Sequence, residues 1–277
     1  MIRIVTATGA LLALVFPAAA QAQHGKRPVP PPPPLVIGVP SMAPMPAPLT
    51  ALNALPATPA TLALGRELAE LLNGGEVARL QYDKLFNETM PRSMGENPAL
   101  AAVEKQHPGA IAYVVAAARP VVEKAMNDRA PLLYDRLAQI YATNLTEAEL
   151  QEMLVFYRSP AGIWLVRQVA QGMDMSALFN RAMADPDTKV TSGDMVSAQQ
   201  GAVISTFPNM PAEHRAALMR LGTRPVLAKL GRINPLLAAA AAQWANDAPP
   251  ELQTQVNNAM IGAMQRYVAE HPAKATQ

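Results

Sequence analysis

The sequence predicts an all-α fold, a helical bundle or array of roughly eight to ten helices that follows a disordered, proline-rich N-terminal segment. Half of the residues are hydrophobic but only 5% are aromatic, and alanine-rich apolar content of this kind favours closely packed helices over sheets. From Pro59 onward, apolar residues recur at the spacing of an amphipathic helix. We therefore expect one helical array, which two degenerate repeat units could build.

The first 22 residues have the pattern of a secretory signal peptide. A short positive start with Arg3 precedes an apolar run over residues 4–16, and Ala20-Gln21-Ala22 is an A-x-A cleavage signal. Cleavage would leave a mature chain that starts near Gln23. The alternative is an uncleaved membrane anchor, but the apolar run is shorter than the ~20 residues that a spanning helix needs. We predict a periplasmic or secreted protein with no integral membrane segment after cleavage.

Composition limits the classes of partner. The formal net charge of +2 is too small to indicate nucleic acid or an anionic membrane surface as a partner. The chain contains no cysteine, so neither a lipid-modified cysteine nor a stabilising disulfide is possible. We expect the partner to be an unidentified protein or envelope component, and the composition leaves the oligomeric state open.

Residues 23–59 form a proline-rich linker that we expect to be disordered. The linker contains twelve prolines, and those from Pro30 to Pro34 are consecutive. Proline fixes φ and lacks an N–H group, so the segment favours extended polyproline II at ~3.1 Å per residue. Two functional interpretations stay open beside simple disorder. The linker could hold the helices away from a surface, or it could be a ligand for a proline-binding module.

Helical patterns follow in chain order and are separated by proline or glycine signals. Asn73-Gly74-Gly75 is typical of a helix C-terminus, and residues 91–98 are expected to be a loop. Pro120 and Pro131 can kink or divide the helical stretch in which they lie. The expected helices are 60–73, 76–90, 99–118, 120–142, 194–206, 211–221, 225–246 and 250–270.

Local signals are densest in residues 145–166, where a capped helix meets a second helix at a proline. Thr146 and Glu149 have the spacing of a capping box, in which each side chain bonds the backbone N–H of the other residue. Leu145 can pack on Leu150 as a hydrophobic staple. The apolar stripe of this first helix is predicted to consist of Leu150, Met153, Leu154 and Tyr157.

The second helix of this pair is predicted to start at a serine–proline step. Ser159 is the expected helix cap, and Pro160 occupies the first helical position, where its missing N–H is tolerated. Gly162 leaves room for a close approach of the two backbones. Because no basic recognition helix accompanies the pair, the sequence does not favour DNA binding.

We call this pair of helices, residues 145–166, the corner. A longer motif runs through it, T-x-x-E-L…F-Y-x-S-P-x-G, and its residues are Thr146, Glu149, Leu150, Phe156, Tyr157, Ser159, Pro160 and Gly162. The motif resembles the DUF2059 family of exported bacterial helical proteins, which has no established function. The resemblance covers residues 130–185 and implies a helical fold and export, but no catalytic residues. In that family the positions after the glycine are usually polar or lysine-rich. Here they are Ile163 and Trp164, which puts a surface role of these positions in question.

A second stretch of the chain shows a weak sequence similarity to the corner. At a constant offset, Pro160 aligns with Pro225 and Leu165 aligns with Leu230, but the second copy lacks the tyrosine and the glycine. The match is either a degenerate repeat or chance similarity between two alanine-rich helical stretches. We divide the chain after the linker into a helical domain at 60–190 and a C-terminal helical unit at 191–277.

Few residues are candidates for catalysis or metal binding. The four histidines are dispersed without metal-type spacing, and no phosphate-binding, zinc-protease or serine-hydrolase motif occurs. Glu149, Glu152 or His214 could serve a hydrolase, although a solvated helix start also explains the two glutamates. Soft thioethers select Cu(I), but single methionine pairs supply too few ligands; the pairs are Met42 with Met45, and Met173 with Met175. We predict no catalytic residue, no cofactor and no metal.

These observations favour a non-enzymatic, exported interaction or envelope-maintenance module that uses a groove between helices. One alternative is a carrier of an apolar small molecule or lipid in a helical cavity. A less favoured alternative is an unrecognised hydrolase.

Overall fold

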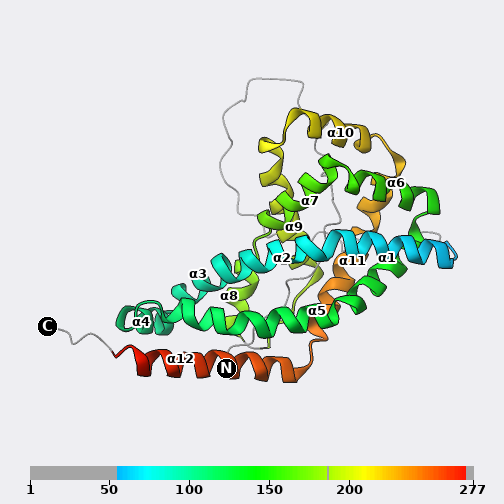
Figure 1. Ribbon diagram of the computed structural model, residues 1–277. Helices are drawn as coiled ribbons and strands as arrows, with labels where there is room; N and C mark the ends of the chain where they lie inside the picture. The colour runs from blue at the N-terminus through cyan, green and yellow to red at the C-terminus, as the bar shows by residue number, and fades with distance from the viewer. Residues whose placement is uncertain (1–54, 186, 273–277) are drawn as a thin grey trace, which may run out of the picture.

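Every regular element of the described chain is helical (Figure 1). The computed structural model describes residues 55–185 and 187–272, and this part of the chain confirms the predicted all-α class. The expected signal peptide and the linker as far as residue 54 lie outside the described residues, as do Met42 and Met45. The elements are α1 (Pro59–Asn73), α2 (Gly75–Lys84), the π-turn η2 (Leu85–Thr89), α3 (Met90–Glu96), α4 (Pro98–Gln106), α5 (Ala110–Asn144), α6 (Glu147–Arg158), α7 (Pro160–Gly172), α8 (Ser176–Ala184), α9 (Ser192–Thr206), the 3-10 turn η3 (Phe207–Asn209), α10 (Ala212–Gly222), α11 (Pro225–Asn246) and α12 (Pro250–Glu270).

Helix α5 is the spine of the fold. It is 35 residues long and packs against α1, α11 and α12. Figure 1 shows it running between α1 to α3 on one side and α12 on the other. Its buried side chains recur on successive turns, as at Val122, Met126, Leu133 and Leu137. At this spacing the four side chains share one face of the helix, which faces the core.

Helix α5 continues through Pro120 and Pro131, so the predicted division into helices 99–118 and 120–142 is wrong. Each proline removes one N–H group and frees the carbonyl four residues earlier. The prolines are exposed, and so are Ala116 and Asn127, which carry the freed carbonyls. Water can therefore satisfy these carbonyls. Packing against several helices outweighs the local preference for a break.

The break in this region lies instead at Gly109, between α4 and α5. Gly109 has φ +95°, a left-handed conformation that favours glycine. The Glu104 carboxylate accepts the backbone N–H groups of Gly109 and Ile111, at 2.7 and 2.8 Å. The Tyr267 hydroxyl donates to the Pro108 carbonyl. This turn therefore fastens the end of α12 to the start of α5.

The loop predicted at residues 91–98 is also wrong, because the chain stays helical from Gly75 to Glu96. The π-turn joins α2 to α3, and Pro91 lies in the first turn of α3, where a missing N–H is tolerated. The chain breaks only at Asn97, whose side chain caps α4 by accepting the N–H groups of Ala99 and Leu100.

Helices α6 to α11 form the remainder of the core. Helix α7 packs against α2, α9 and α10, and α11 packs against α5 and α9. The buried side chains of these helices belong to one hydrophobic cluster with those of α1 and α5. The proposed boundary at residue 190 stays a prediction. No helix in residues 55–185 and 187–272 is long and apolar enough to cross a membrane.

The two stretches compared as a repeat share a plan but differ in burial. Pro160 begins α7 and Pro225 begins α11, so each stretch is a helix, a proline step and a second helix. Leu154 is buried, whereas Met219 at the corresponding position is 69% exposed. The repeat relationship stays a prediction.

Replacing Gly109 with alanine should destabilise the fold. A residue with a Cβ loses about 1–2 kcal/mol in a left-handed conformation, and this Cβ would also lie 2.6 Å from the Tyr267 hydroxyl. We expect the free energy of unfolding, measured by urea titration with circular dichroism, to fall by at least about 1 kcal/mol. The matched control is Gly95→Ala, because a Cβ at Gly95 meets nothing within 4 Å. Equal stability of the two variants would contradict the strain assigned to Gly109.

Candidate functional site

The corner between α6 and α7 begins with the capping box that the sequence predicts. The Glu149 carboxylate accepts the Thr146 backbone N–H at 2.8 Å, and the Thr146 hydroxyl accepts the Glu149 backbone N–H at 3.3 Å. Leu145 and Leu150, the predicted staple pair, are both fully buried. These contacts determine where α6 begins.

Ser159, Pro160 and Gly162 form the joint itself. The Ser159 hydroxyl donates to the Phe156 carbonyl at 2.6 Å and accepts the Gly162 N–H at 3.2 Å. Pro160 is the first residue of α7. A Cβ built on Gly162 would lie 2.2 Å from the Phe156 carbonyl oxygen and 2.5 Å from the Tyr157 Cα. Only glycine fits this space, so the predicted close backbone approach is confirmed.

Tyr157 of the motif is a core residue. It is 2% exposed, and its hydroxyl has no hydrogen-bond partner among the described residues. Burial, together with the neighbouring Tyr141, raises the pKa of Tyr157 well above its ordinary range. The half-buried Phe156 ring packs edge-on against Tyr157, with 5.2 Å between the ring centroids. Tyr157 therefore contributes packing to the corner.

The three residues considered for hydrolysis have separate partners. Glu149 binds Lys229 at 2.7 Å and Glu152 binds Arg224, so both glutamates tie α6 to the start of α11. Burial opposes ionisation of Glu149, but hydrogen bonds from Lys229 and Thr146 hold its pKa below the usual range. His214 lies on α10, in a groove that neither glutamate lines. The geometry therefore does not bring the three side chains together.

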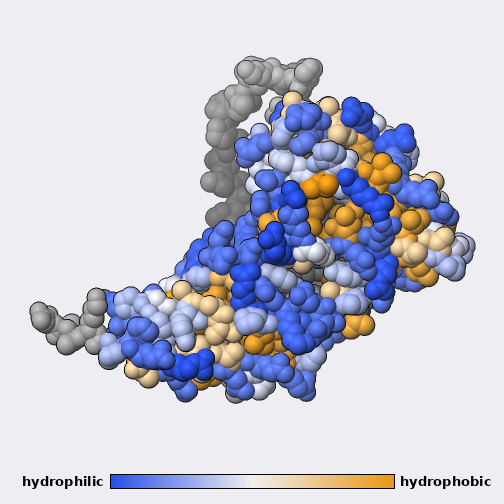
Figure 2. All heavy atoms as spheres, in the orientation of Figure 1, coloured by the Kyte–Doolittle hydropathy of each residue, from blue (hydrophilic) through white to orange (hydrophobic). Residues whose placement is uncertain are grey.

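That groove lies between α2, α7 and α10, directly beside the corner. Its volume is about 620 Å³, and its apolar and aromatic lining comes from Leu80, Pro160, Ile163, Trp164 and His214. Figure 2 shows hydrophobic residues gathered over α6 and α7 on the face in view. The groove is the candidate binding site of the described chain.

Trp164 and Ile163 are the main side chains of the groove. The Trp164 ring is half-buried and lies 5.6 Å from the His214 ring, centroid to centroid, at an interplanar angle of 46°. Ile163 is 40% exposed. Because Leu165 and Val169 bury the opposite face of α7 in the core, both groove residues lie at the surface. The sequence signal for this site was the pair of apolar residues where the resemblance implies polar ones.

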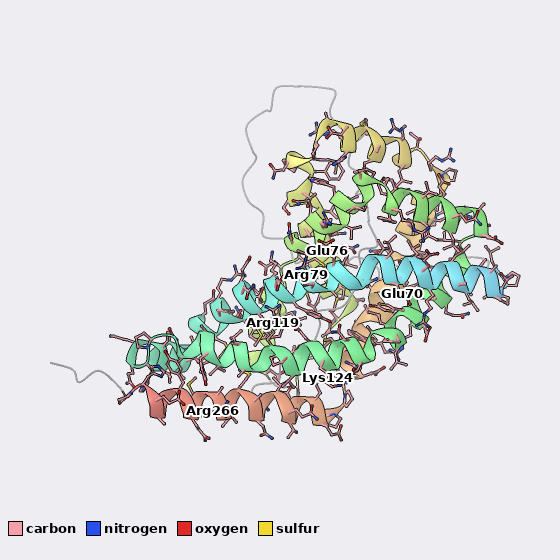
Figure 3. The ribbon with its side chains drawn as sticks, viewed as in Figure 1. Glu70, Glu76, Arg79, Arg119, Lys124 and Arg266 are labelled. Carbon is pink, nitrogen blue, oxygen red and sulfur yellow. The ribbon has the colours of Figure 1, made fainter. Side chains whose placement is uncertain are left out.

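Charged residues at the rim of the groove pair with each other. Arg167 donates two hydrogen bonds to one Glu76 carboxylate oxygen, at 2.7 and 3.0 Å. Arg79 lies 3.7 Å from the other Glu76 oxygen, and Figure 3 shows Glu76 and Arg79 together on α2. Exposed pairs of this kind add little stability. Glu76 is already engaged by both arginines, so the aromatic and apolar lining is the main recognition feature of the groove.

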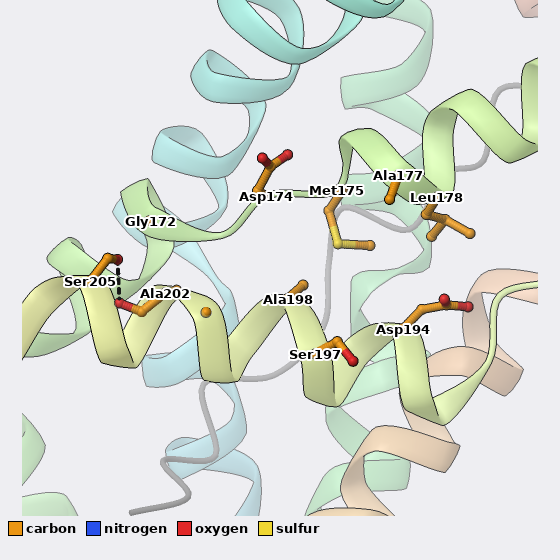
Figure 4. A pocket seen from close by; sticks show the side chains of 11 residues that line it. Gly172, Asp174, Met175, Ala177, Leu178, Asp194, Ser197, Ala198, Ala202 and Ser205 are labelled. Carbon is orange, nitrogen blue, oxygen red and sulfur yellow. Dashed lines mark hydrogen bonds between the residues drawn. The ribbon is translucent and has the colours of Figure 1, made fainter. Parts of the chain in front are cut away.

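A second pocket, of about 380 Å³, lies where the chain after α7 passes α8 and α9 (Figure 4). The two carboxylates in this pocket already accept hydrogen bonds from neighbouring groups. Asp174 accepts the Ser176 backbone N–H at 2.9 Å, and Asp194 accepts Arg181 at 2.8 Å. Much of the α9 wall consists of small residues such as Ala202. These features indicate helix capping and packing.

The methionine pair after the corner lies in two different environments. Met173 is buried, and its sulfur accepts a hydrogen bond from the Gln81 amide at 3.6 Å. Met175 lines the second pocket. Within residues 55–185 and 187–272, no group of three or more histidine, aspartate or glutamate side chains could hold a metal ion.

Comparison with known proteins matches the corner to a family. Residues 133–184 match the family model DUF2059, which is described as an uncharacterized protein conserved in bacteria. The match runs from the last part of α5 through α6 and α7 to the end of α8, and it confirms the resemblance seen in the motif. No curated protein and no solved structure matches the chain.

Replacing Gly162 with alanine should lower the free energy of unfolding by about 1–3 kcal/mol or more, because overpacking forces a backbone to move. The colliding atoms belong to the backbone of α6 and cannot rotate away. The control is Gly231→Ala in α11, where a Cβ meets nothing within 4 Å and stability should rise by about 0.5–1 kcal/mol. Urea titration of both variants checks the difference. A Gly162→Ala variant as stable as the parent would show that the joint tolerates a side chain.

The Glu149–Lys229 pair should make stability depend on pH in acid. The folded-state pKa of Glu149 lies below the ordinary value of 4.5. The pair therefore stabilises the fold above that value, and this contribution is lost as the pH falls through the folded-state pKa. Between about pH 5 and about pH 3, we expect Glu149→Gln or Lys229→Met to reduce the loss of unfolding free energy. The double variant should match Glu149→Gln, whereas Lys229→Met alone should have a smaller effect, because Thr146 still lowers the pKa of Glu149 in that variant. An equal loss of unfolding free energy in the parent protein, the two single variants and the double variant would show that the pair does not cause the pH dependence.

Proposed function

We propose, from the DUF2059 match at residues 133–184 and the groove beside it, that the protein is a non-enzymatic, exported interaction module. In this proposal a protein or envelope component binds in the α2–α7–α10 groove. The observation that carries it is the half-buried Trp164 next to the exposed Ile163. Tryptophan is among the residues most enriched at the energetic centres of protein interfaces.

The walls of the groove are held in place before any partner arrives, which supports the proposal. Helix α7 packs against both α2 and α10, with the Arg167–Glu76 pair across the first interface and the Trp164 and His214 rings across the second. The Gly162 contact holds the start of α7 against α6. A preformed site avoids much of the ordering cost of binding.

The proposed compartment is the periplasm or the outside of the cell. The signal-peptide pattern of residues 1–22 supports this compartment. Cell fractionation followed by mass spectrometry of the N-terminus tests it: a mature chain that starts near Gln23 in the periplasmic or secreted fraction supports export, and an intact N-terminus in the cytoplasmic fraction contradicts it.

A carrier of an apolar small molecule or lipid is the second candidate. The groove volume of about 620 Å³ falls within the ~300–1,000 Å³ typical of small-molecule sites. Native mass spectrometry of protein purified from cells distinguishes the two functions. A lipid-sized adduct that is lost in the Ile163→Asp variant favours the carrier.

A photo-crosslinking amino acid at position 163 should capture the partner in intact envelopes. The same amino acid at position 261 should not, although Ile261 is 56% exposed, because α12 lies on the opposite side of α5 from α7 (Figure 1). Adding Trp164→Ala to the position-163 probe should reduce the yield. Capture of the same species from both positions, or no capture from position 163, would contradict binding in the groove.

A further inference from the structure

We infer that the α2–α7–α10 groove binds the proline run of its own chain, residues 28–34, and that a partner must displace this run. The inference rests on the proposed function, because it names what occupies the groove before a partner binds. Three features support it: the aromatic lining of the groove, an available hydrogen-bond donor, and the reach of the chain before Leu55.

The lining has the chemistry that proline-rich segments recognise. Extended proline-rich chains dock on aromatic surfaces, because proline rings pack against aromatic faces and the extended form loses little entropy on binding. The tilted rings of Trp164 and His214, flanked by Leu80 and Ile163, form such a surface. The second pocket has no aromatic lining residue, so it does not offer the same recognition.

The groove also presents a donor for a backbone carbonyl. In the part of the chain that the structure describes, nothing accepts a hydrogen bond from the indole N–H of Trp164, whose ring lies beside that of His214. A polyproline II chain has carbonyls without internal hydrogen bonds. A carbonyl of the proline run can therefore accept from Trp164 while proline rings cover the indole.

The linker is long enough to bring the run to the groove. The described chain starts at Leu55, whose N–H donates to the Thr143 carbonyl at 2.7 Å. From there α1 leads to α2, which carries the groove residues Glu76 and Leu80. Helix α1 and the first turns of α2, placed end to end, span roughly 30 Å at 1.5 Å per residue. The residues between the run and Leu55 reach roughly 60 Å at ~3.1 Å per residue, about twice the required distance.

Attachment to the same chain favours this occupant over a free one. A tethered ligand acts at an effective concentration that reaches the mM range for short linkers. A contact between the run and Trp164 would therefore be formed most of the time if its dissociation constant lies below that concentration. A partner would then bind with reduced apparent affinity, because it has to displace the run.

Tryptophan fluorescence tests the inference in the chain without residues 1–22. Trp244 is 2% exposed, so added acrylamide quenches mainly Trp164. Changing Pro30 to Pro34 to serine should raise the quenching constant about two-fold, as expected if the tethered run covers the indole most of the time. A synthetic peptide of residues 26–36, added to this variant, should restore the protection saturably. The matched control changes four prolines elsewhere in the linker to serine and should leave quenching unchanged: Pro40, Pro44, Pro46 and Pro48.

Two results would overturn the inference. In the first, quenching is the same in all three proteins and the peptide has no effect. In the second, the protection of Trp164 disappears on dilution, which would mean that a second copy supplies the run. Circular dichroism confirms that the serine variants keep their helices.

The inference and the proposed function can fail separately. A partner captured from position 163, with no effect of the proline substitutions, would retain the function and reject the inference. Protection of Trp164 by the run, with no partner captured, would retain the inference and reject the proposed function.

Discussion

The close contact between Gly162 and the backbone of Phe156 and Tyr157 determines where α7 lies. With no Cβ between them, α6 and α7 can meet at the serine–proline step while Ser159 closes both helix ends with its hydroxyl. Helix α7 then packs against α2, α9 and α10. Since these neighbours include the walls of the groove, the shape of the candidate site depends on the approach of two backbones.

Helix α11 connects this corner to the spine of the fold. Lys229 near its start pairs with Glu149, the capping-box residue of α6. Near its end, the Trp244 indole N–H donates to the Arg129 carbonyl of α5 at 3.1 Å. The Arg129 guanidinium lies over the same indole, 4.7 Å from the ring centroid. Helix α11 therefore links α6 of the corner to α5.

The exposed apolar side chains that line the groove have a consequence for binding. Exposed apolar surface promotes association with unintended partners. A tethered proline run would cover Trp164 without belonging to the core, because polyproline II needs no internal hydrogen bonds. The same cover would require a partner with enough affinity to displace it, so it would also add selectivity.

The sequence by itself determined the all-α class and the corner, because the capping box, the serine–proline start and Gly162 act on atoms within a few residues along the chain. Only the tertiary structure decided that α5 continues through Pro120 and Pro131, since packing on several sides outweighs the loss of one hydrogen bond at each. It also decided that Trp164 meets His214 in an open groove. Spacing along the chain reveals local hydrogen bonds, whereas the exposure of a helix face depends on which distant helices cover it.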